Sequence, residues 1–102
     1  MEAHLLDNLI AFSSKFHTKR IFFDSGRVKA QVMGFEPGQQ IPPCRMENDV
    51  IFVVLEGQGE IIIDEEKETI AESSWVFVPK EKESRSLKAV TRMAVLAIQV
   101  RG

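Results

Sequence analysis

Short apolar segments, spaced at roughly 8–12 residues and separated by glycine, proline or polar turns, run through most of this chain. In one of them Val28, Ala30 and Val32 alternate with polar residues, a period of two that is typical of a half-buried strand. About eight such segments with no helix between them indicate an antiparallel sandwich or barrel rather than a parallel α/β sheet. We therefore expect a single all-β unit.

The segments also give a strand-by-strand expectation. Strands are predicted at 20–23, 28–32, 41–43, 50–55, 60–63, 68–71, 75–78, 84–90 and 93–100. The segment 50–55 is apolar at every position, which predicts a strand that is covered on both faces. Gly57 and Gly59, which follow it, predict a hairpin.

The first residues carry a different pattern. Leu5, Leu6, Leu9 and Ile10 recur at helical spacing, which predicts one short amphipathic helix over roughly 3–14. We expect residues 1–18 to form this helix and its connection, and residues 19–102 to form the β domain. The apolar helix face must be covered by the same domain or by a second copy, and open sheet edges also gain from pairing. A homodimer is the expected assembly.

Composition narrows the partners and the compartment. A net charge of −2 gives no general attraction to nucleic acid or to anionic lipid. The single cysteine, Cys44, cannot form an internal disulfide, which suits a reducing interior. The longest uninterrupted apolar run, 50–55, is too short to span a bilayer, and no basic leader precedes the first apolar residues. We expect a cytoplasmic protein with no nucleic-acid partner and no membrane partner.

Two stretches, 38–57 and 73–88, resemble the two motifs of the cupin superfamily. Gly38 and Gly57 stand at the matching ends of the first motif. In the second, Pro79 follows the predicted strand 75–78, as the family proline does, and Ser73 replaces the opening glycine. The resemblance implies a double-stranded β-helix, the jelly-roll barrel of the cupins, here with one short N-terminal helix.

The resemblance does not extend to the metal ligands of the family. The family's ligand positions fall on Cys44, Met46, Val50 (or Ile51, if the motif gap is one residue longer) and Ser84. None of these is a histidine or a glutamate, so we expect no metal site, no cofactor and no catalytic residue. Metal-free epimerases that share this fold use a histidine and a tyrosine. This chain has no tyrosine, and its two histidines, His4 and His17, precede the barrel.

The motif alignment also predicts which side chains line the barrel interior. The expected pocket residues are Cys44, Met46, Val50, Phe52, Trp75, Phe77 and Ser84. This lining is mainly apolar, with a thiol and a hydroxyl as its polar points, so it suits a small apolar or weakly polar ligand. A collapsed core would have the same composition, because small barrels either fill with side chains or leave room for one ligand.

Cys44 has three possible roles. A lone cysteine is usually a small buried apolar residue. Arg45 beside it could instead favour a reactive thiolate. Met46 could join Cys44 as a second soft ligand for a metal such as copper(I).

Three functions remain open from the sequence. The leading interpretation is a metal-free small-molecule-binding or accessory protein that is not an enzyme. The alternative is a metal-dependent enzyme, oxygenase-like or isomerase-like, with an unconventional site around Cys44 that includes Met46 and the carboxylates of Glu47 or Asp49. The third is a structural barrel that binds only protein partners.

Overall fold

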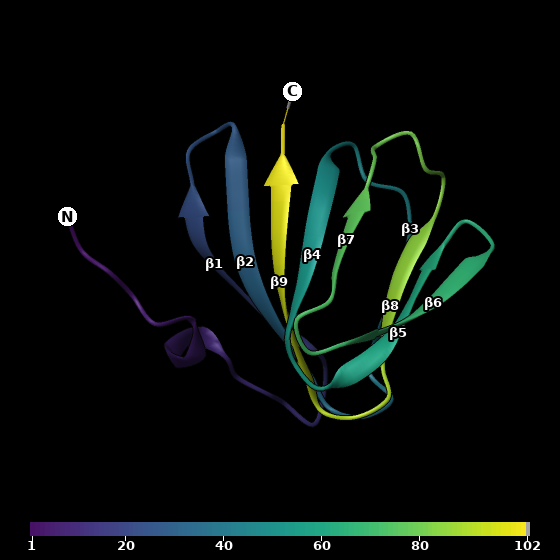
Figure 1. Ribbon diagram of the computed structural model, residues 1–102, viewed down its shortest axis with the longest axis horizontal. Helices are drawn as coiled ribbons and strands as arrows, with labels where there is room; N and C mark the ends of the chain where they lie inside the picture. Colours follow the sequence, from purple (N-terminus) through teal and green to yellow (C-terminus); the bar gives the residue numbers. More distant parts are fainter. Residues whose placement is uncertain (102) are drawn as a thin grey trace.

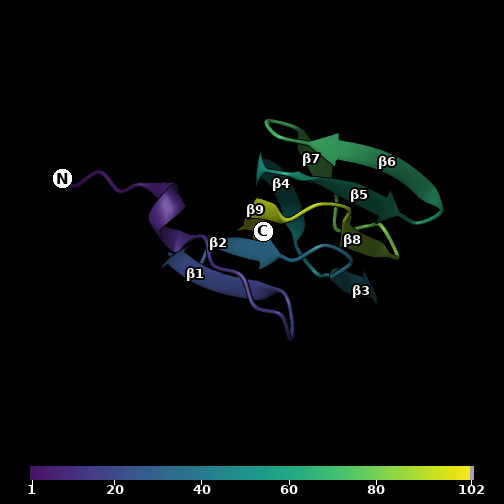
Figure 2. The same ribbon diagram turned by 90° about the horizontal axis from the view of Figure 1, so that it is seen from below.

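Nine antiparallel strands form two sheets that face each other in a barrel (Figures 1 and 2). The computed structural model describes residues 1–101. The first sheet has the order β1-β2-β9-β4-β7, with β1 at Thr18–Asp24, β2 at Val28–Phe35, β9 at Met93–Val100, β4 at Asp49–Glu56 and β7 at Trp75–Val78. The second has the order β3-β8-β5-β6, with β3 at Gln40–Cys44, β8 at Arg85–Ala89, β5 at Gln58–Ile63 and β6 at Glu66–Ala71. The all-β jelly-roll prediction is confirmed.

The barrel has one closed end and one open end. The closed end is where β2 ends and β9 begins. There Phe35 pairs with Met93 and Met33 pairs with Val95, and their side chains fill the space between the sheets. Ile61 of β5 packs into the same cluster. The two sheets fan apart toward the opposite end, where β9 ends (Figure 1). The hydrophobic core therefore fills the closed end and continues along β4 and β7 to Val50 and Val78.

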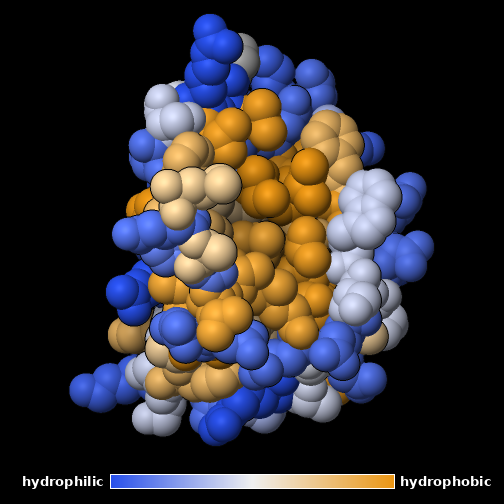
Figure 3. Space-filling model, turned by 60° about the vertical axis from the view of Figure 1, so that its left-hand side comes forward, coloured by the Kyte–Doolittle hydropathy of each residue, from blue (hydrophilic) through white to orange (hydrophobic). Residues whose placement is uncertain are grey.

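Strand β4 is covered on one face only. Val50, Phe52 and Val54 are buried inside the barrel, as the apolar segment predicted. Ile51, Val53 and Leu55 point outward and are half-buried, so the expectation that both faces are covered is wrong for the single chain. Figure 3 shows that one face of the molecule carries a broad apolar region.

The glycine-rich segment 56–59 connects two different sheets. The predicted hairpin is wrong, because β4 pairs with β7 and β9 whereas β5 pairs with β6 and β8. Gly57 has φ +82°, and a Cβ there would collide with the carbonyl oxygen of Arg92. Glycine is required at this position by both its backbone conformation and a close backbone approach. The sequence marked a sharp turn correctly but did not show that the turn crosses between layers.

The N-terminal segment contains one turn of 3₁₀ helix, η1, at Leu6–Leu9, in place of the predicted helix over 3–14. Isolated helices of this length are marginal in water without packing. The following residues bond to the barrel instead: Thr18 Oγ1 donates to the Ala11 carbonyl (2.6 Å) and Gln39 Nε2 donates to the Ser13 carbonyl (2.7 Å). No helix within residues 1–101 has the length and hydropathy needed to cross a membrane.

Candidate binding pocket

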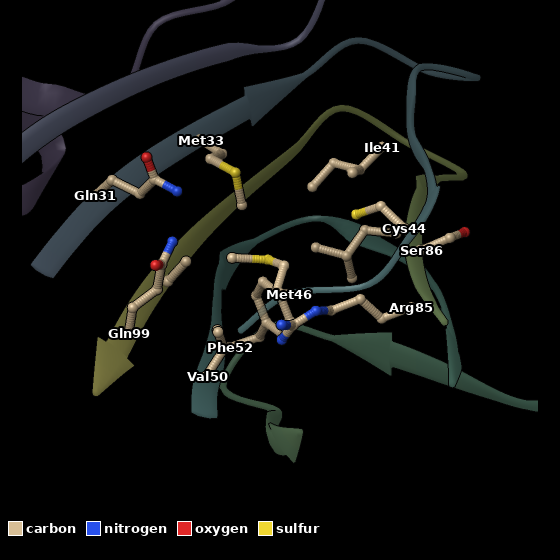
Figure 4. A pocket seen from close by; sticks show the side chains of 12 residues that line it. Gln31, Met33, Ile41, Cys44, Met46, Val50, Phe52, Arg85, Ser86 and Gln99 are labelled. Carbon is tan, nitrogen blue, oxygen red and sulfur yellow. The ribbon is translucent and has the colours of Figure 1, made fainter. Parts of the chain in front are cut away.

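A cavity of about 50 Å³ lies between the two sheets, near the open end of the barrel (Figure 4). One wall comes from β2 and β9 and carries Gln31, Met33, Ala97 and Gln99. The facing wall comes from β3 and β8 and carries Ile41, Cys44, Arg85, Ser86 and Leu87. Met46, Val50 and Phe52 complete the lining. Most of this surface is apolar, with a few polar groups that converge from opposite sheets.

Four of the predicted pocket residues line this cavity: Cys44, Met46, Val50 and Phe52. Val50 and Phe52 are buried and share the inner face of β4. Cys44 ends β3 and is exposed, so it is not the small buried apolar residue that a lone cysteine usually is. Cys44 therefore borders the cavity from an exposed position.

Trp75 and Phe77 lie outside the barrel, so their assignment to the pocket is wrong. In the β4–β7 register Val76 pairs with Phe52 and Val78 pairs with Val50, which places both valines on the inner face. Trp75 and Phe77 therefore face outward and are 68% and 49% exposed. All four residues of β7 are apolar, so the sequence offers no alternation, and a shift of one residue moves every side chain to the other face.

Ser84 does not line the cavity either. It lies before β8, where its N–H donates to Asp64 Oδ1 (3.0 Å) and its carbonyl accepts from the Asp64 N–H (2.8 Å). Arg85 and Ser86 line the cavity in its place, with Arg85 paired to Cys44 across the β3–β8 ladder. The motif alignment thus identified the correct segment, but the side chain that enters the cavity comes one residue later.

Arg85 is the site residue that the sequence reasoning missed. It is 5% exposed, and its Nη2 donates to the Asn48 carbonyl over 3.3 Å. Burial lowers the pKa of Arg85, and the Cys44 and Asp49 side chains act in the opposite direction. The only sequence signal is that Arg85 has the same strand parity as the apolar residues Leu87 and Ala89, and this signal is weak because Ser86, of the opposite parity, is buried as well.

The loop before β4 connects several polar groups around the cavity. Asn48 Nδ2 donates to Gln99 Oε1 (3.3 Å), so Asn48 bridges Gln99 and Arg85. Asp49 Oδ1 accepts from the Lys80 N–H (2.8 Å) and holds the segment after β7. Glu47 is exposed and does not line the cavity. The carboxylates of Glu47 and Asp49 therefore do not form a paired acid–base site.

The residues at the family's ligand positions do not fit the metal that the motif implies. Cys44 and Met46 offer two sulfur atoms, and Val50 offers no donor. Within residues 1–101 no group of three or more His, Cys, Asp or Glu side chains is arranged to hold a metal ion. His17 lies outside the cavity, where its ring stacks on Phe35 with centroids 5.3 Å apart. His4 lies in the N-terminal segment, with its Nε2 3.7 Å from Oε2 of Glu2.

The backbone conformation at the motif anchors accounts for the two glycines of the first motif. Gly38 and Gly57 have φ +85° and +82°, in the left-handed region that favours glycine. Ser73, at the position of the family's third glycine, has φ 72° and adopts the same conformation with a side chain. These residues specify the turns of the barrel independently of any metal.

Sequence comparison gives a partial match to a protein of uncharacterized function. No protein-family model matches the sequence. An uncharacterized protein of Aquifex aeolicus is 35% identical over 51 residues, a match that spans 50% of this chain and 42% of that protein.

Solved structures match over the whole chain. An RmlC-like cupin protein from Desulfovibrio desulfuricans superposes with a TM-score of 0.86 at 25% identity, covering 98% of this chain and 96% of that one. A cupin superfamily protein from Desulfitobacterium hafniense superposes with a TM-score of 0.89 at 21% identity, covering 100% of this chain and 94% of that one. With the jelly-roll topology and the two motif skeletons, these matches show that the chain belongs to the cupin superfamily.

Proposed function

We propose that this protein is a small-molecule-binding cupin whose function does not depend on a bound metal. The observation that carries the proposal is the cavity at the open end, where apolar walls and a few convergent polar groups meet. Ligand sites typically combine a mainly apolar concave lining with a few placed polar groups. The cavity lies at the positions that the family motif uses for its site, and the side chains there supply no histidine.

Binding can be tested with a small neutral probe such as xenon or n-propanol, followed by ¹H–¹⁵N NMR. We expect saturable shift changes confined to the cavity residues. Cys44→Phe should block the opening and abolish them. Arg45→Phe is the matched control, because Arg45 is an exposed neighbour that does not line the cavity. Absence of cavity-localised shifts in the unmodified protein would contradict the proposal and favour a structural barrel.

Metal independence has its own measurement. Elemental analysis of untagged protein, purified without added metal or chelator, should find well below one transition-metal equivalent per chain. About one equivalent would contradict the proposal and support the alternative enzyme. Loss of that metal in Cys44→Ala would then locate it at the two sulfur atoms.

We further propose that a second copy of the chain covers the outer face of the five-stranded sheet. The outward-facing residues of its β4, β9 and β7 strands are apolar and exposed or half-buried: Ile51, Val53, Leu55, Leu96, Ile98, Trp75 and Phe77. The three strands that carry these residues, about 4.8 Å apart and some 20 Å long, give a flat footprint of roughly 290 Å², to which side-chain relief adds accessible area. Interfaces of stable complexes bury about 800 Å² per partner, and homodimer interfaces are the more apolar ones.

The second copy is the occupant that this face fits best. A two-fold dimer brings the same patch together from both chains, so the patch must be compatible with itself. The apolar side chains of β4, β9 and β7 meet this condition, because apolar groups can pack against copies of themselves. Phe77→Glu would place one carboxylate from each chain in the apolar interface, and light scattering during size exclusion should then show a monomer. Phe16→Glu is the matched control, because Phe16 is exposed in the N-terminal segment. An unmodified protein that runs as a monomer would refute the dimer.

A further inference from the structure

The cavity wall contains a buried cation with unused hydrogen-bond donors. Arg85 is 5% exposed, and its Nη1 is buried with no hydrogen-bond partner within residues 1–101. Its Nη2 makes a long bond, 3.3 Å, to the Asn48 carbonyl. A guanidinium carries five N–H donors in a planar fork that matches the two oxygens of a carboxylate or a phosphate. The described part of the chain leaves part of this fork unfilled.

The charge of Arg85 also lacks a carboxylate partner. The ion pairs within residues 1–101 join Lys67 to Glu60, Arg92 to Glu36, Arg101 to Asp24 and His4 to Glu2. Asp49 acts on Arg85 electrostatically, but no ion pair joins the two side chains within residues 1–101. Buried charges in proteins are normally paired, because removing an ion from water is costly. An anionic ligand would supply the missing partner.

The other lining residues indicate the chemistry of that anion. Arg85 is the one charged side chain among the residues that line the cavity. The amides of Gln31 and Gln99 lie on the facing wall (Figure 4) and can donate hydrogen bonds. One cation neutralises one negative charge, so a monoanion fits better than a doubly charged phosphate. Met46 and Phe52 provide an apolar surface beside the guanidinium.

The volume of the cavity limits the size of the ligand. A cavity needs roughly 10–15 Å³ for each water-sized group, so this cavity holds a few heavy atoms. Its volume of about 50 Å³ thus suits a carboxylate with a short aliphatic part.

We infer that the cavity binds a small monocarboxylate. The carboxylate accepts hydrogen bonds from the Arg85 guanidinium, and the aliphatic part contacts Met46 and Phe52. This inference rests on the proposed function, because it names the ligand class of the same cavity. It differs from the apolar or weakly polar ligand that the sequence suggested, since the missed arginine makes one wall cationic.

The test compares a carboxylate with its neutral amide in the full chain. Acetate, propionate and butyrate are titrated by ¹H–¹⁵N NMR that includes the arginine Nε–H resonances, in parallel with propionamide and inorganic phosphate. We expect propionate to shift the Arg85 resonance and to bind at least tenfold more tightly than propionamide. Arg85→Met should weaken propionate binding at least tenfold. Arg85→Lys keeps the charge without the planar fork and should weaken it less.

Arg45→Met is the matched control. It removes the same charge from an exposed position beside the cavity opening and should leave propionate binding unchanged. If Arg85→Met does not fold, Arg85→Lys and the propionate-to-propionamide ratio of the unmodified protein decide the question.

The outcomes separate the inference from the proposed function. Equal binding of propionate and propionamide would overturn the inference and leave small-molecule binding intact. Binding of phosphate without propionate would also overturn it, as would equal losses in Arg45→Met and Arg85→Met. If none of the carboxylates, propionamide or the neutral probe n-propanol shifts the cavity resonances, the inference and the proposed function both fail.

Discussion

The two ends of the barrel are made from the same strands but have different chemistry. Along the inner face of β2 the side chains run from Gln31 at the open end through Met33 to Phe35 at the closed end. Strand β8 runs from Arg85 to Leu87 in the same sense. The closed end stabilises the fold by close packing, whereas the open end keeps polar groups and space. One continuous strand can therefore serve stability at one end and binding at the other.

The largest expected effect is at the closed end. Phe35→Ala removes a side chain that is 0% exposed, so the free energy of unfolding should fall by about 3–5 kcal/mol. Urea denaturation followed by circular dichroism measures this loss. The comparison variant is Phe52→Ala. Phe52 borders the existing cavity, so the free energy of unfolding should fall by about 1 kcal/mol less, or by a still smaller amount, than in Phe35→Ala. Equal losses would show that the two ends are packed alike.

Glycines in left-handed turns at the two ends give the next comparison. Gly57→Ala combines φ +82° with a clash against the Arg92 carbonyl. We expect the free energy of unfolding to fall by an amount in the upper half of the range of about 1–3 kcal/mol. Gly26→Ala, in the turn between β1 and β2, has φ +88° but open space around the Cβ. It should show the backbone strain alone, near 1 kcal/mol. A larger loss in Gly26→Ala would contradict the assignment of a crowded turn to the closed end.

Arg85→Met should have a small effect on the free energy of unfolding, in the direction of higher stability. In the ligand-free protein it removes a buried charge without an ion-pair partner in the described structure and adds an apolar side chain of similar length. The free energy of unfolding should stay constant or rise by about 1 kcal/mol. Thermal denaturation in a carboxylate-free buffer measures this change. A clear loss of stability would mean that Arg85 supports the fold rather than a ligand.

The smallest effect concerns pH and the ring stack beside the closed end. Burial lowers the pKa of His17, with a further contribution from Lys19. Well above pH 6.5, the ordinary pKa of histidine, the imidazole is neutral in both the folded and the unfolded state, so it adds no pH dependence. Below that pH the unfolded chain takes up the proton first, so stability should fall and then level off below the folded-state pKa. In His17→Phe the urea midpoint should change less between pH 7 and pH 5 than in the unmodified protein. An equal change in both proteins would contradict the assignment of this pH dependence to His17.

Much of the fold could be predicted because its signals are local. Period-two alternation in β2 identified that strand, but the expectation of a half-buried strand is wrong, because every residue from Ala30 to Phe35 is buried and the polar Gln31 lines the cavity. The glycines at 38 and 57 marked turns whose φ values favour glycine. The errors concern choices that only packing decides. The uniformly apolar β7 gave no sign of which face points inward, and the leucine pattern near residue 6 could not form a helix without a surface to pack on.

The candidate site was predicted less well than the fold. Cys44 and Met46 were identified because the family motif fixes their position. Arg85 was missed because a charged residue next to a turn is usually taken to be exposed. Its burial follows from the β3–β8 and β5–β8 pairings, which place it opposite Cys44 and Ile63. Long-range register of this kind is not contained in a local pattern.

The place of β9 in the first sheet has a consequence for folding kinetics. It lies between β2 and β4, although β2 is more than fifty residues earlier in the chain. Neither the sheet nor the cavity can form until residues 93–100 are available, whereas the hairpins β1–β2 and β5–β6 can form early. Non-local pairing of this kind is typical of chains that fold in milliseconds to seconds. During that interval the apolar faces of the early hairpins are open to other chains, so refolding yield should depend on protein concentration.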